Sequence, residues 1–398
     1  MIRKVRATNF KNFESIDVDF SDFNVVIGQN SSGKSNLVSI FQFIKDISTV
    51  GLSNAISLQG GLEYLLNFKN SHDGPMEIEI VSDNKKNIFI GGPHGIKLSE
   101  VSYKIQIYPF KRKNGIKRFF EEVTIKSCDS KLSANESSEI KIISDNGKLK
   151  AVGDSEDINK VFPFGDIFDE YSGKEFGSLM RFPPLSFFLG FGSEIGIQVY
   201  DFDPKLSKRA IPIAGKAELE SDGSNTTLLL RKIFNKPDER KKFIEYLRVC
   251  LPFVRDLSVE NQVDRSLLFK MSETYNSKTD IPAFIISDGT IEIVSIIYAL
   301  FFEQKKLIVI EEPERNIHPH LISNLMNLIK EASKRKQIII TTHSPEIIKH
   351  VTLDNLYIVD RDKNGSSKVF RASDKKEIEV FLKEKIGIDE LFIDGILN

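Results

Sequence analysis

The chain has 398 residues, of which 40% are hydrophobic and 28% are charged, and its formal net charge at pH 7 is −1. These values are typical of a soluble globular protein of two to three domain-sized units, and they exclude a global basic field for nucleic acid or anionic membranes. Cys128 and Cys250 are too few and too far apart for a disulfide framework or a zinc site, and the N-terminus lacks the apolar core of a signal peptide, so we expect a cytoplasmic protein.

The first 27 residues carry the pattern of three strands. Residues 5–10 and the alternating run at 16–20 predict a half-buried antiparallel pair, and the apolar run at 23–27 predicts a strand that stops at Gly28. Apolar residues at helical spacing follow at 36–47. Strand, glycine-bounded loop and helix in this order form one half of a βαβ unit.

The rest of the chain alternates between strand-rich and helical patterns. Short strands are expected within 75–127, with a hairpin at Asn114-Gly115, whereas residues 128–165 are polar and weakly periodic. A helical pattern at 224–254 is ended by Pro252. Beyond residue 280 an α/β pattern returns, with strands expected at 283–286, 306–311, 337–341 and 355–359.

These patterns predict an α/β protein whose core is built from both ends of the chain. We expect residues 1–127 and 280–398 to form a discontinuous nucleotide-binding core that includes a β-hairpin lobe. Residues 128–279 are expected to form an inserted α+β, mainly helical region. The sequence has no internal repeat and no heptad run, so no coiled coil is expected.

The loop after the third strand carries a phosphate-binding motif. Its sequence, Gly28-Gln29-Asn30-Ser31-Ser32-Gly33-Lys34-Ser35, matches G-x-x-x-x-G-K-S/T in full and lies between a predicted strand and a predicted helix, as the motif requires. Backbone N–H groups of such a loop and of the helix N-terminus, here at Asn36, cradle phosphate oxygens. Lys34 would reach the β- and γ-phosphates and the Ser35 hydroxyl would ligate Mg²⁺. We therefore expect ATP and Mg²⁺ as cofactors; a chance match is the weaker alternative.

Paired carboxylates follow a buried strand. Four apolar residues at 307–310 lead into Glu311 and Glu312, so the strand directs acid groups at a site beyond its C-terminal end. A Mg²⁺ held mainly by phosphate oxygens and water accepts one nearby carboxylate, the expected role of Glu311. Glu312 can then deprotonate the attacking water. A solvated acidic strand end is the plainer alternative, and the phosphate-binding loop makes it less favoured.

Two further segments fit the same site. The strand at 337–341 leads to His343, where an imidazole could sense a γ-phosphate, so His343 joins Lys34 and Glu312 as a candidate catalytic residue. Ser287-Asp288-Gly289 directly precedes a predicted helix and brings a hydroxyl, a glycine amide and a helix N-terminus together, which suits an anion. Alone, each segment would be read as an ordinary surface histidine or turn.

Together these motifs resemble the ABC-type heads of AAA-family ATPases and the ATPase half of OLD-family (overcoming lysogenization defect) nucleases. RecF-like and structural-maintenance-of-chromosomes (SMC) heads are more distantly similar. Residues 9–13 (NFKNF) and 222–225 (DGSN) also look like that group. The resemblance implies a P-loop ABC-type head with an antiparallel β subdomain. It also implies that Ser287 and Gly289 contact the γ-phosphate of ATP bound to a second subunit, and that His343 is the switch histidine.

The chain departs from the general ABC pattern in two places. Glu311 stands where aspartate is usual, and His318-Pro319 replaces the usual aspartate of the dimer-facing D-loop, which the resemblance places at residues 316–318. Gln59, within the sequence LQGG, is the candidate Q-loop glutamine for nucleotide and Mg²⁺ binding. A plain turn is the alternative for that segment, because glycine-flanked glutamines also occur in turns.

The resemblance favours a regulatory ATPase. ATP binding would drive formation of a homodimer or higher oligomer, which controls a separately encoded effector in antiphage defence or in a toxin-like module. A DNA-binding repair or maintenance head is the second hypothesis; the low net charge opposes it, and the basic hairpin at 111–118 is more simply a solvated tip. A stand-alone OLD-like nuclease is the third. Asp360 and Asp362 mimic a metal pair, yet a strand, turn and strand explain that segment better, and few residues follow His343 for a nuclease domain.

Overall fold

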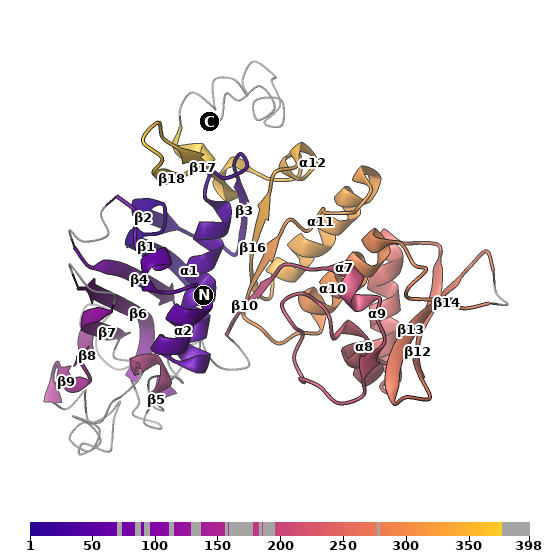
Figure 1. The fold of residues 1–398 in the computed structure, drawn as a ribbon, viewed down its shortest axis with the longest axis horizontal. Coiled ribbons are helices and arrows are strands. Elements are labelled where there is room, and N and C mark those ends of the chain that lie inside the picture. The colour runs from indigo at the N-terminus through magenta and orange to yellow at the C-terminus, as the bar shows by residue number, and fades with distance from the viewer. Residues whose placement is uncertain are drawn as a thin grey trace. The chain divides into compact units, whose positions relative to one another are not determined.

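The computed structural model describes residues 1–69, 74–83, 89–90, 96–110, 115–128, 137–155, 158, 178–182, 185, 196–276 and 279–375. The chain divides into two compact units (Figure 1). The first contains Met1–Ser21, Asn30–Ile197 and Val359–Phe370, and the second contains Asp22–Gln29, Gln198–Ile358 and Arg371–Asn398. Both units therefore combine segments from the beginning and the end of the chain.

An antiparallel sheet of eight strands dominates the first unit. Its strand order is β2-β1-β4-β6-β7-β8-β9, and β5 pairs with β6. Three helices, α1 (Lys34–Val50), α2 (Leu52–Leu58) and α3 (Leu62–Leu65), separate β1 and β2 from the later strands in the sequence. The strands are β1 (Ile2–Phe10), β2 (Phe13–Asp19), β4 (Met76–Asp83), β5 (Phe89–Ile90), β6 (Ile96–Pro109), β7 (Ile116–Cys128), β8 (Ser137–Asp145) and β9 (Lys148–Val152).

Alternation along the strands gives this sheet an apolar face. Val5 and Ala7 of β1 are fully buried opposite the equally buried Ile80 and Ile78 of β4. Aromatic residues of α1 pack on this side of the unit, with the ring centroids of Phe10 and Phe43 6.5 Å apart and those of Phe20 and Phe41 5.7 Å apart. Burial of these side chains holds α1, and with it the end of the phosphate-binding loop, on the sheet.

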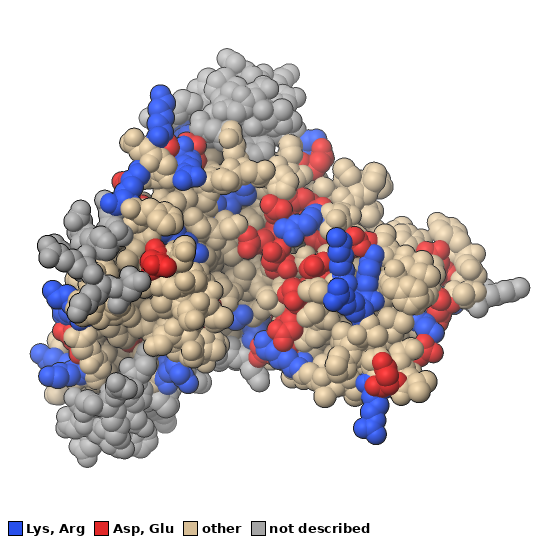
Figure 2. Space-filling model, viewed as in Figure 1, with Lys and Arg blue, Asp and Glu red and all other residues tan. Residues whose placement is uncertain are grey.

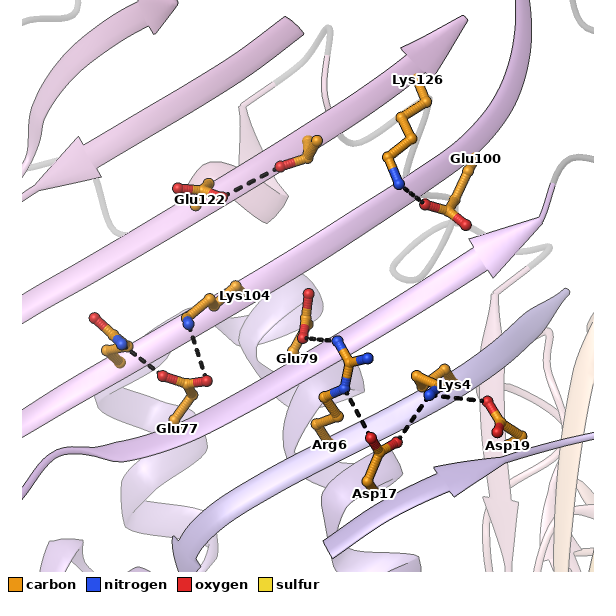
Figure 3. A network of polar contacts seen from close by, with 12 residues as sticks. Lys4, Arg6, Asp17, Asp19, Glu77, Glu79, Glu100, Lys104, Glu122 and Lys126 are labelled. Atoms are coloured by element: carbon orange, nitrogen blue, oxygen red, sulfur yellow. Dashed lines mark hydrogen bonds and ion pairs between the residues drawn. The ribbon is translucent and has the colours of Figure 1, made fainter. Parts of the chain in front are cut away.

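Cross-strand ion pairs cover the opposite face (Figure 3). Arg6 bonds Asp17 of β2 through Nε at 3.1 Å and Glu79 of β4 through Nη1 at 2.7 Å. Farther along the sheet, Lys126 Nζ lies 2.7 Å from Glu100. Each exposed pair contributes only about 0–1 kcal/mol, but opposite charges on facing strands favour this register over a slipped one.

One carboxyl group lies on the buried side of the same sheet. Glu121 of β7 accepts hydrogen bonds from the Tyr103 hydroxyl at 2.5 Å, the Ser178 hydroxyl at 2.5 Å and the Leu179 N–H at 2.9 Å. Ser178 also caps the short 3₁₀ helix η2 (Leu179–Arg181). Burial raises the pKa of Glu121 to about 7. The carboxyl group thus fastens η2 to the sheet.

A mainly parallel sheet forms the centre of the second unit. The strand order is β10-β15-β16-β3-β17-β18, in which the last residues of β17 and most of β18 belong to the first unit. Neighbours from β15 to β17 are parallel, and residues of β3, β15 and β16 are almost all buried, as expected of a sheet covered on both faces. The strands are β3 (Phe23–Ile27), β10 (Ile197–Tyr200), β15 (Leu307–Glu311), β16 (Gln337–Thr342), β17 (Leu356–Arg361) and β18 (Ser367–Arg371).

Helices and a second, smaller sheet complete this unit. The four-stranded sheet has the order β11-β13-β12, with β14 also pairing with β13. Its strands are β11 (Ile211–Pro212), β12 (Val254–Asn261), β13 (Ser266–Glu273) and β14 (Ile281–Pro282). The helices are α7 (Pro204–Ser207), α8 (Thr226–Phe234), α9 (Pro237–Cys250), α10 (Asp288–Phe301), α11 (Pro319–Ser333) and α12 (Pro345–Ile348), with the short 3₁₀ turns η3 (Leu353–Asn355) and η4 (Ala372–Asp374).

The DGSN segment joins three helices of the second unit. The Gly223 carbonyl accepts hydrogen bonds from the Ser207 hydroxyl of α7 at 2.7 Å and the Thr226 hydroxyl of α8 at 2.6 Å, and Thr226 lies 3.0 Å from the Ser295 hydroxyl of α10. Gly223 has φ +76°, and a Cβ there would lie 2.9 Å from the Phe202 ring. Glycine is therefore required by the packing of this segment.

Most predicted elements are confirmed, one expected strand is absent, and one hairpin was not predicted. Residues 283–286 form a turn instead of a strand, because Ile285 N–H and Ile286 N–H close back on the Pro282 and Ala283 carbonyls. Residues 137–152, whose sequence is polar and weakly periodic, form the hairpin β8–β9, whose Asn146-Gly147 turn has φ values of +48° and +82°. Such a dipeptide is a strong hairpin signal.

The two compact units also divide the chain differently from the expected domains. The expected boundary at 127/128 falls at the end of β7, and β8 and β9 beyond it continue the sheet of the first unit. The polar composition of this region hid the continuation, since one face of these strands is solvated. Among the helices that the structure describes, none is long and apolar enough to cross a membrane.

Glu121→Gln should remove a pH-dependent part of the stability. The pKa of Glu121 is raised by burial to about 7 in the folded chain, against 4.5 for the ordinary group, so the folded state binds this proton more tightly than the unfolded state. The contribution is complete below about pH 4.5 and is lost as the pH rises to about 7. Relative to the variant, the wild-type free energy of unfolding should therefore fall by about 1–3 kcal/mol across this window in urea titrations. Glu122→Gln, on the charged face, is the control, and a flat difference between wild type and Glu121→Gln would contradict the assignment.

Candidate nucleotide-binding site

The phosphate-binding loop leaves the parallel sheet at its carboxyl edge. Gly28 directly follows β3, whose last residue, Ile27, is level with Thr342 of β16. α1 begins at Lys34 after Gly33, whose φ is +116°, and no side chain caps this helix end. A helix N-terminus without a side-chain cap, preceded by a glycine loop, is suited to bind an anion such as a phosphate group.

The individual loop residues differ in exposure. Asn30, Ser31 and Ser35 are exposed and Asn36 is half-buried, whereas Ser32 and Lys34 are buried. Lys34 keeps only 8% of its surface exposed, which is unusual for a lysine and typical of one held within a binding site. Ser31 has a left-handed backbone with φ +65°.

The acid pair lies at the carboxyl edge of β15. Glu311 is the last residue of the strand and pairs in register with Thr341 of β16. Glu312 has φ +45°, and its N–H donates to the Thr341 carbonyl at 2.9 Å. A glutamate in this left-handed conformation is strained by about 1–3 kcal/mol, so neighbouring contacts must hold it.

Two side chains hold the Glu312 carboxyl group. Oε1 lies 3.0 Å from His343 Nδ1, and Oε2 accepts a hydrogen bond from Arg315 Nη2 at 3.3 Å. Arg315 Nη1 also donates to Asp201 at 3.0 Å, just after β10. The structure therefore brings together the two residues that the sequence proposed as base and switch histidine. It adds Arg315 and Asp201, for which the sequence contained no signal beyond a charge in the loop.

A third carboxyl group supports the loop between these residues. Glu314 is mostly buried and accepts a hydrogen bond from the Thr342 hydroxyl at 2.5 Å, and Thr342 in turn accepts one from Ser344 N–H at 2.9 Å. Burial raises the pKa of Glu314. These bonds connect the loop after β15 to the segment that carries His343.

Ser287 and Gly289 begin α10. The Ser287 hydroxyl accepts a hydrogen bond from Thr290 N–H at 3.3 Å and donates one to the Thr290 hydroxyl at 2.8 Å, so it caps the helix. Asp288 forms an ion pair with Lys208. A Cβ at Gly289 would lie 2.3 Å from the Asn316 carbonyl oxygen, which explains this glycine by packing within the chain.

Asn316 and His318 lie in the loop that the sequence assigned to a D-loop. Asn316 has φ +63°, and its amide donates to the buried Glu292 of α10 at 3.1 Å. Burial raises the pKa of Glu292 to about 8. His318 caps α11 by accepting a hydrogen bond from His320 N–H at 3.2 Å. The His318-Pro319 pair is therefore a helix start, with proline in the first turn.

Gln59 is held by a neighbouring cation. It ends α2, and its Oε1 accepts a hydrogen bond from Lys11 Nζ at 2.9 Å. Burial lowers the pKa of Lys11. Gln59 could ligate a metal ion through Oε1 only by exchanging or sharing this bond. Gln59 and residues 30–36 belong to the first unit, whereas Gly28, Ser287, Gly289, Glu311, Glu312 and His343 belong to the second.

Comparisons with known families identify the chemistry. Residues 1–178 match the model of an AAA ATPase domain, and residues 173–349 match a second model, described as "AAA domain, putative AbiEii toxin, Type IV TA system". The protein is an ATPase. It is 22% identical to an ATP/GTP phosphatase of Helicobacter pylori over 93% of this chain and 92% of that one. Over 92 residues it is 29% identical to the DNA replication and repair protein RecF of Oceanobacillus iheyensis, covering 23% of this chain and 19% of RecF.

Solved structures show the same fold. An SMC head bound to the C-winged helix domain of ScpA aligns with a TM-score of 0.52 at 18% identity, over 93% of this ATPase and 96% of that chain. An SMC head with an extended coiled coil, bound to the C-terminal domain of ScpA from Pyrococcus furiosus, aligns with a TM-score of 0.50 at 15% identity, over 97% and 99% of the two chains. The ATPase therefore has the mixed α/β P-loop fold of SMC and ABC heads, with its antiparallel sheet.

Gly289→Ala should disturb the segment Ser287-Asp288-Gly289 at the start of α10. The added methyl group would overlap the Asn316 carbonyl, so α10 and the loop after Glu312 must move apart, at a cost of about 1–3 kcal/mol in stability. We expect a lower melting temperature and reduced ATP turnover. Gly74→Ala is the control, since a Cβ there meets no described atom within 4 Å. A Gly289→Ala protein with the stability and turnover of the control would refute this packing role.

Proposed function

We propose that this ATPase hydrolyses Mg-ATP with Glu312 as the general base, and that ATP-dependent pairing of two copies controls a separately encoded effector. The contact between Glu312 Oε1 and His343 Nδ1, 3.0 Å long, is the observation that carries the proposal. It joins a proton acceptor to a group able to donate to a γ-phosphate, at the carboxyl ends of β15 and β16, in the sheet whose strand β3 precedes the phosphate-binding loop.

In this proposal the loop binds the phosphates. Backbone N–H groups of residues 28–36 surround the β- and γ-phosphates, and the Lys34 ammonium group neutralises their charge. The Ser35 hydroxyl and the Glu311 carboxylate are hard oxygen donors that suit Mg²⁺, with Gln59 as a further candidate ligand. Among the described residues no group of three or more His, Cys, Asp or Glu side chains could hold a metal ion by itself. The few oxygen donors proposed at Ser35, Glu311 and Gln59 suit a Mg²⁺ that is held mainly by the phosphates of the nucleotide.

The biological role proposed is regulatory, in bacterial or archaeal antiphage defence or in a toxin–antitoxin module. The second family description names a toxin of such a system, which supports this class of role. The resemblance to the ATPase half of OLD-family nucleases supports the idea that another protein supplies the effector activity.

A DNA-repair or DNA-maintenance ATPase is the second candidate. The stretch shared with RecF and the SMC-type fold favour it. On the face shown in Figure 2, however, basic and acidic side chains are interspersed, and the described residues form no extended basic field there. Residues 111–114 of the basic hairpin lie outside the described residues.

A nuclease centre at Asp360 and Asp362 finds no support. Asp362 Oδ1 accepts hydrogen bonds from Asn364 N–H and Ser366 N–H, both at 2.9 Å, and Gly365 has φ +85°. These are the contacts of an Asx turn between β17 and β18. The turn explains why an aspartate occurs at position 362, and Asp360 lies within β17.

Single substitutions separate nucleotide binding from hydrolysis. Lys34→Ala should abolish ATP binding measured by calorimetry, because it removes the cation that faces the β- and γ-phosphates. Glu312→Gln should keep ATP binding while the turnover rate falls about 10²–10⁴-fold, because an amide cannot accept the proton of the attacking water. Unchanged ATP affinity in Lys34→Ala would overturn the loop assignment, and near-normal turnover in Glu312→Gln would move the base role to Glu311 or His343.

A mixing experiment tests the pairing of two copies. Ser287→Asp keeps a helix-capping oxygen at the start of α10 but places a negative charge where a γ-phosphate from a second copy would bind. Alone, Lys34→Ala and Ser287→Asp should both be inactive, and their mixture should recover part of the turnover because one shared site is intact.

Differently tagged copies establish whether mixed dimers form. A mixture of wild type and Ser287→Asp shows whether one intact site suffices for turnover. Suppose that one intact site suffices. If the mixture of Lys34→Ala and Ser287→Asp then stays inactive although mixed dimers form, the proposed shared site is wrong.

A further inference from the structure

Two residues far apart in the sequence meet at the phosphate-binding loop of the first unit. Ser367, the first residue of β18, donates a hydrogen bond from its hydroxyl to the Ser32 carbonyl. The Asn12 side-chain amide, between β1 and β2, donates to the Ser367 hydroxyl at 2.5 Å, and the Ser367 N–H donates to the Asn12 carbonyl at 2.9 Å. Ser367 is only 2% exposed, so water does not compete for these bonds.

The same two side chains fill the space beside Gly33. A Cβ at Gly33 would lie 2.5 Å from Asn12 Nδ2 and 2.8 Å from Ser367 Oγ. The cluster of Asn12 and Ser367 thus approaches the loop backbone so closely that only glycine fits at this position of the motif. The φ of +116° at Gly33 is a second, independent reason for glycine.

The direction of the bond to Ser32 matters for phosphate binding. In a trans peptide the C=O of one residue and the N–H of the next point in opposite directions. Because the Ser32 carbonyl is tied to Ser367, the Gly33 N–H must point away from the cluster. If that carbonyl were released and the peptide rotated, a partial negative charge would turn toward the side on which phosphate oxygens need donors.

β18 is itself anchored next to this cluster. The Ser366 hydroxyl bonds Glu14 of β2 and accepts a hydrogen bond from Lys69 Nζ at 2.9 Å, and Lys69 lies 3.3 Å from Glu14. These contacts hold the strand without touching the loop. Ser366 therefore supplies a neighbouring hydroxyl with a structural role only.

We propose that Asn12 and Ser367 are positioning residues that hold the Ser32–Gly33 peptide of the loop in its phosphate-binding orientation. The inference rests on the proposed nucleotide site and deepens it. It assigns part of the ATP affinity to Asn12, between β1 and β2, and to Ser367, the first residue of β18.

Ser367→Ala should raise the dissociation constant and the KM for Mg-ATP about 3–10-fold, the worth of one hydrogen bond, while kcat changes less than about twofold. Asn12→Asp, which cannot donate to Ser367, should have a similar effect, and the double variant should be no weaker than the stronger single one. Ser366→Ala is the matched control and should leave ATP affinity unchanged. Affinity is measured by calorimetry and stability by thermal unfolding.

The outcomes separate this inference from the proposed function. If Lys34→Ala abolishes binding but Ser367→Ala and Ser366→Ala both bind ATP as wild type does, the positioning role is wrong and the nucleotide site stands. If Lys34→Ala binds normally, the site itself is wrong. If Ser367→Ala does not fold, Ser367→Cys keeps the volume with a much weaker donor, and an unchanged affinity in that folded variant would also overturn the proposal.

Discussion

The parallel strands β3, β15 and β16 end at the same level of their sheet, and the positions of the candidate catalytic residues depend on this constraint. Register places Ile27 of β3 beside Thr342 of β16, and Thr341 beside Glu311 of β15. Since parallel strands have their carboxyl ends at one edge, the chain segments that leave this edge are neighbours although they lie far apart in the sequence. A shift of one residue in any of these strands would move its side chains to the opposite face of the sheet, where they would have to repack, so the packing of the sheet also fixes the position of the acid pair.

Beyond this edge, polar contacts replace apolar packing as the determinant of geometry. Glu312 adopts a left-handed backbone, and His343 and Arg315 bind the two oxygens of its carboxyl group. Nearby, the hydrogen bond between Glu314 and Thr342 connects the loop after β15 to the segment that carries His343. A carboxylate held from both sides has little freedom to reorient, which is the preorganisation that proton transfer requires.

In the first unit, too, burial of apolar side chains and polar contacts together determine the geometry. Its sheet buries one face under α1 and leaves the other solvated, where cross-strand ion pairs favour one register. The buried carboxyl group of Glu121 has partners in Tyr103 and Ser178. At the start of α1, the hydroxyl of Ser367 and the amide of Asn12 restrain a peptide that glycine alone would leave mobile.

The sequence alone determined the class of the protein and most of its elements. A full phosphate-binding motif between a strand and a helix, and an apolar strand ending in Glu311 and Glu312, depend on local order, and local order is visible in a sequence. The hairpin signal at Asn146-Gly147 is equally local. At 283–286 a turn replaces the expected strand, and two of its four apolar residues, Phe284 and Ile285, keep 62% and 65% of their surfaces exposed.

Only the tertiary structure decided which distant residues meet. Arg315 and Asp201 share an ion pair across 114 positions, and Ser367 reaches Ser32 across 335. No spacing rule predicts such contacts, because they follow from sheet order and from loops whose paths are fixed by packing. The role of Gly289 is of the same kind. The sequence around Gly289 suggested that its backbone amide binds a phosphate group. Its close approach to Asn316 follows from the packing of α10 against the loop after β15, which only the tertiary structure shows.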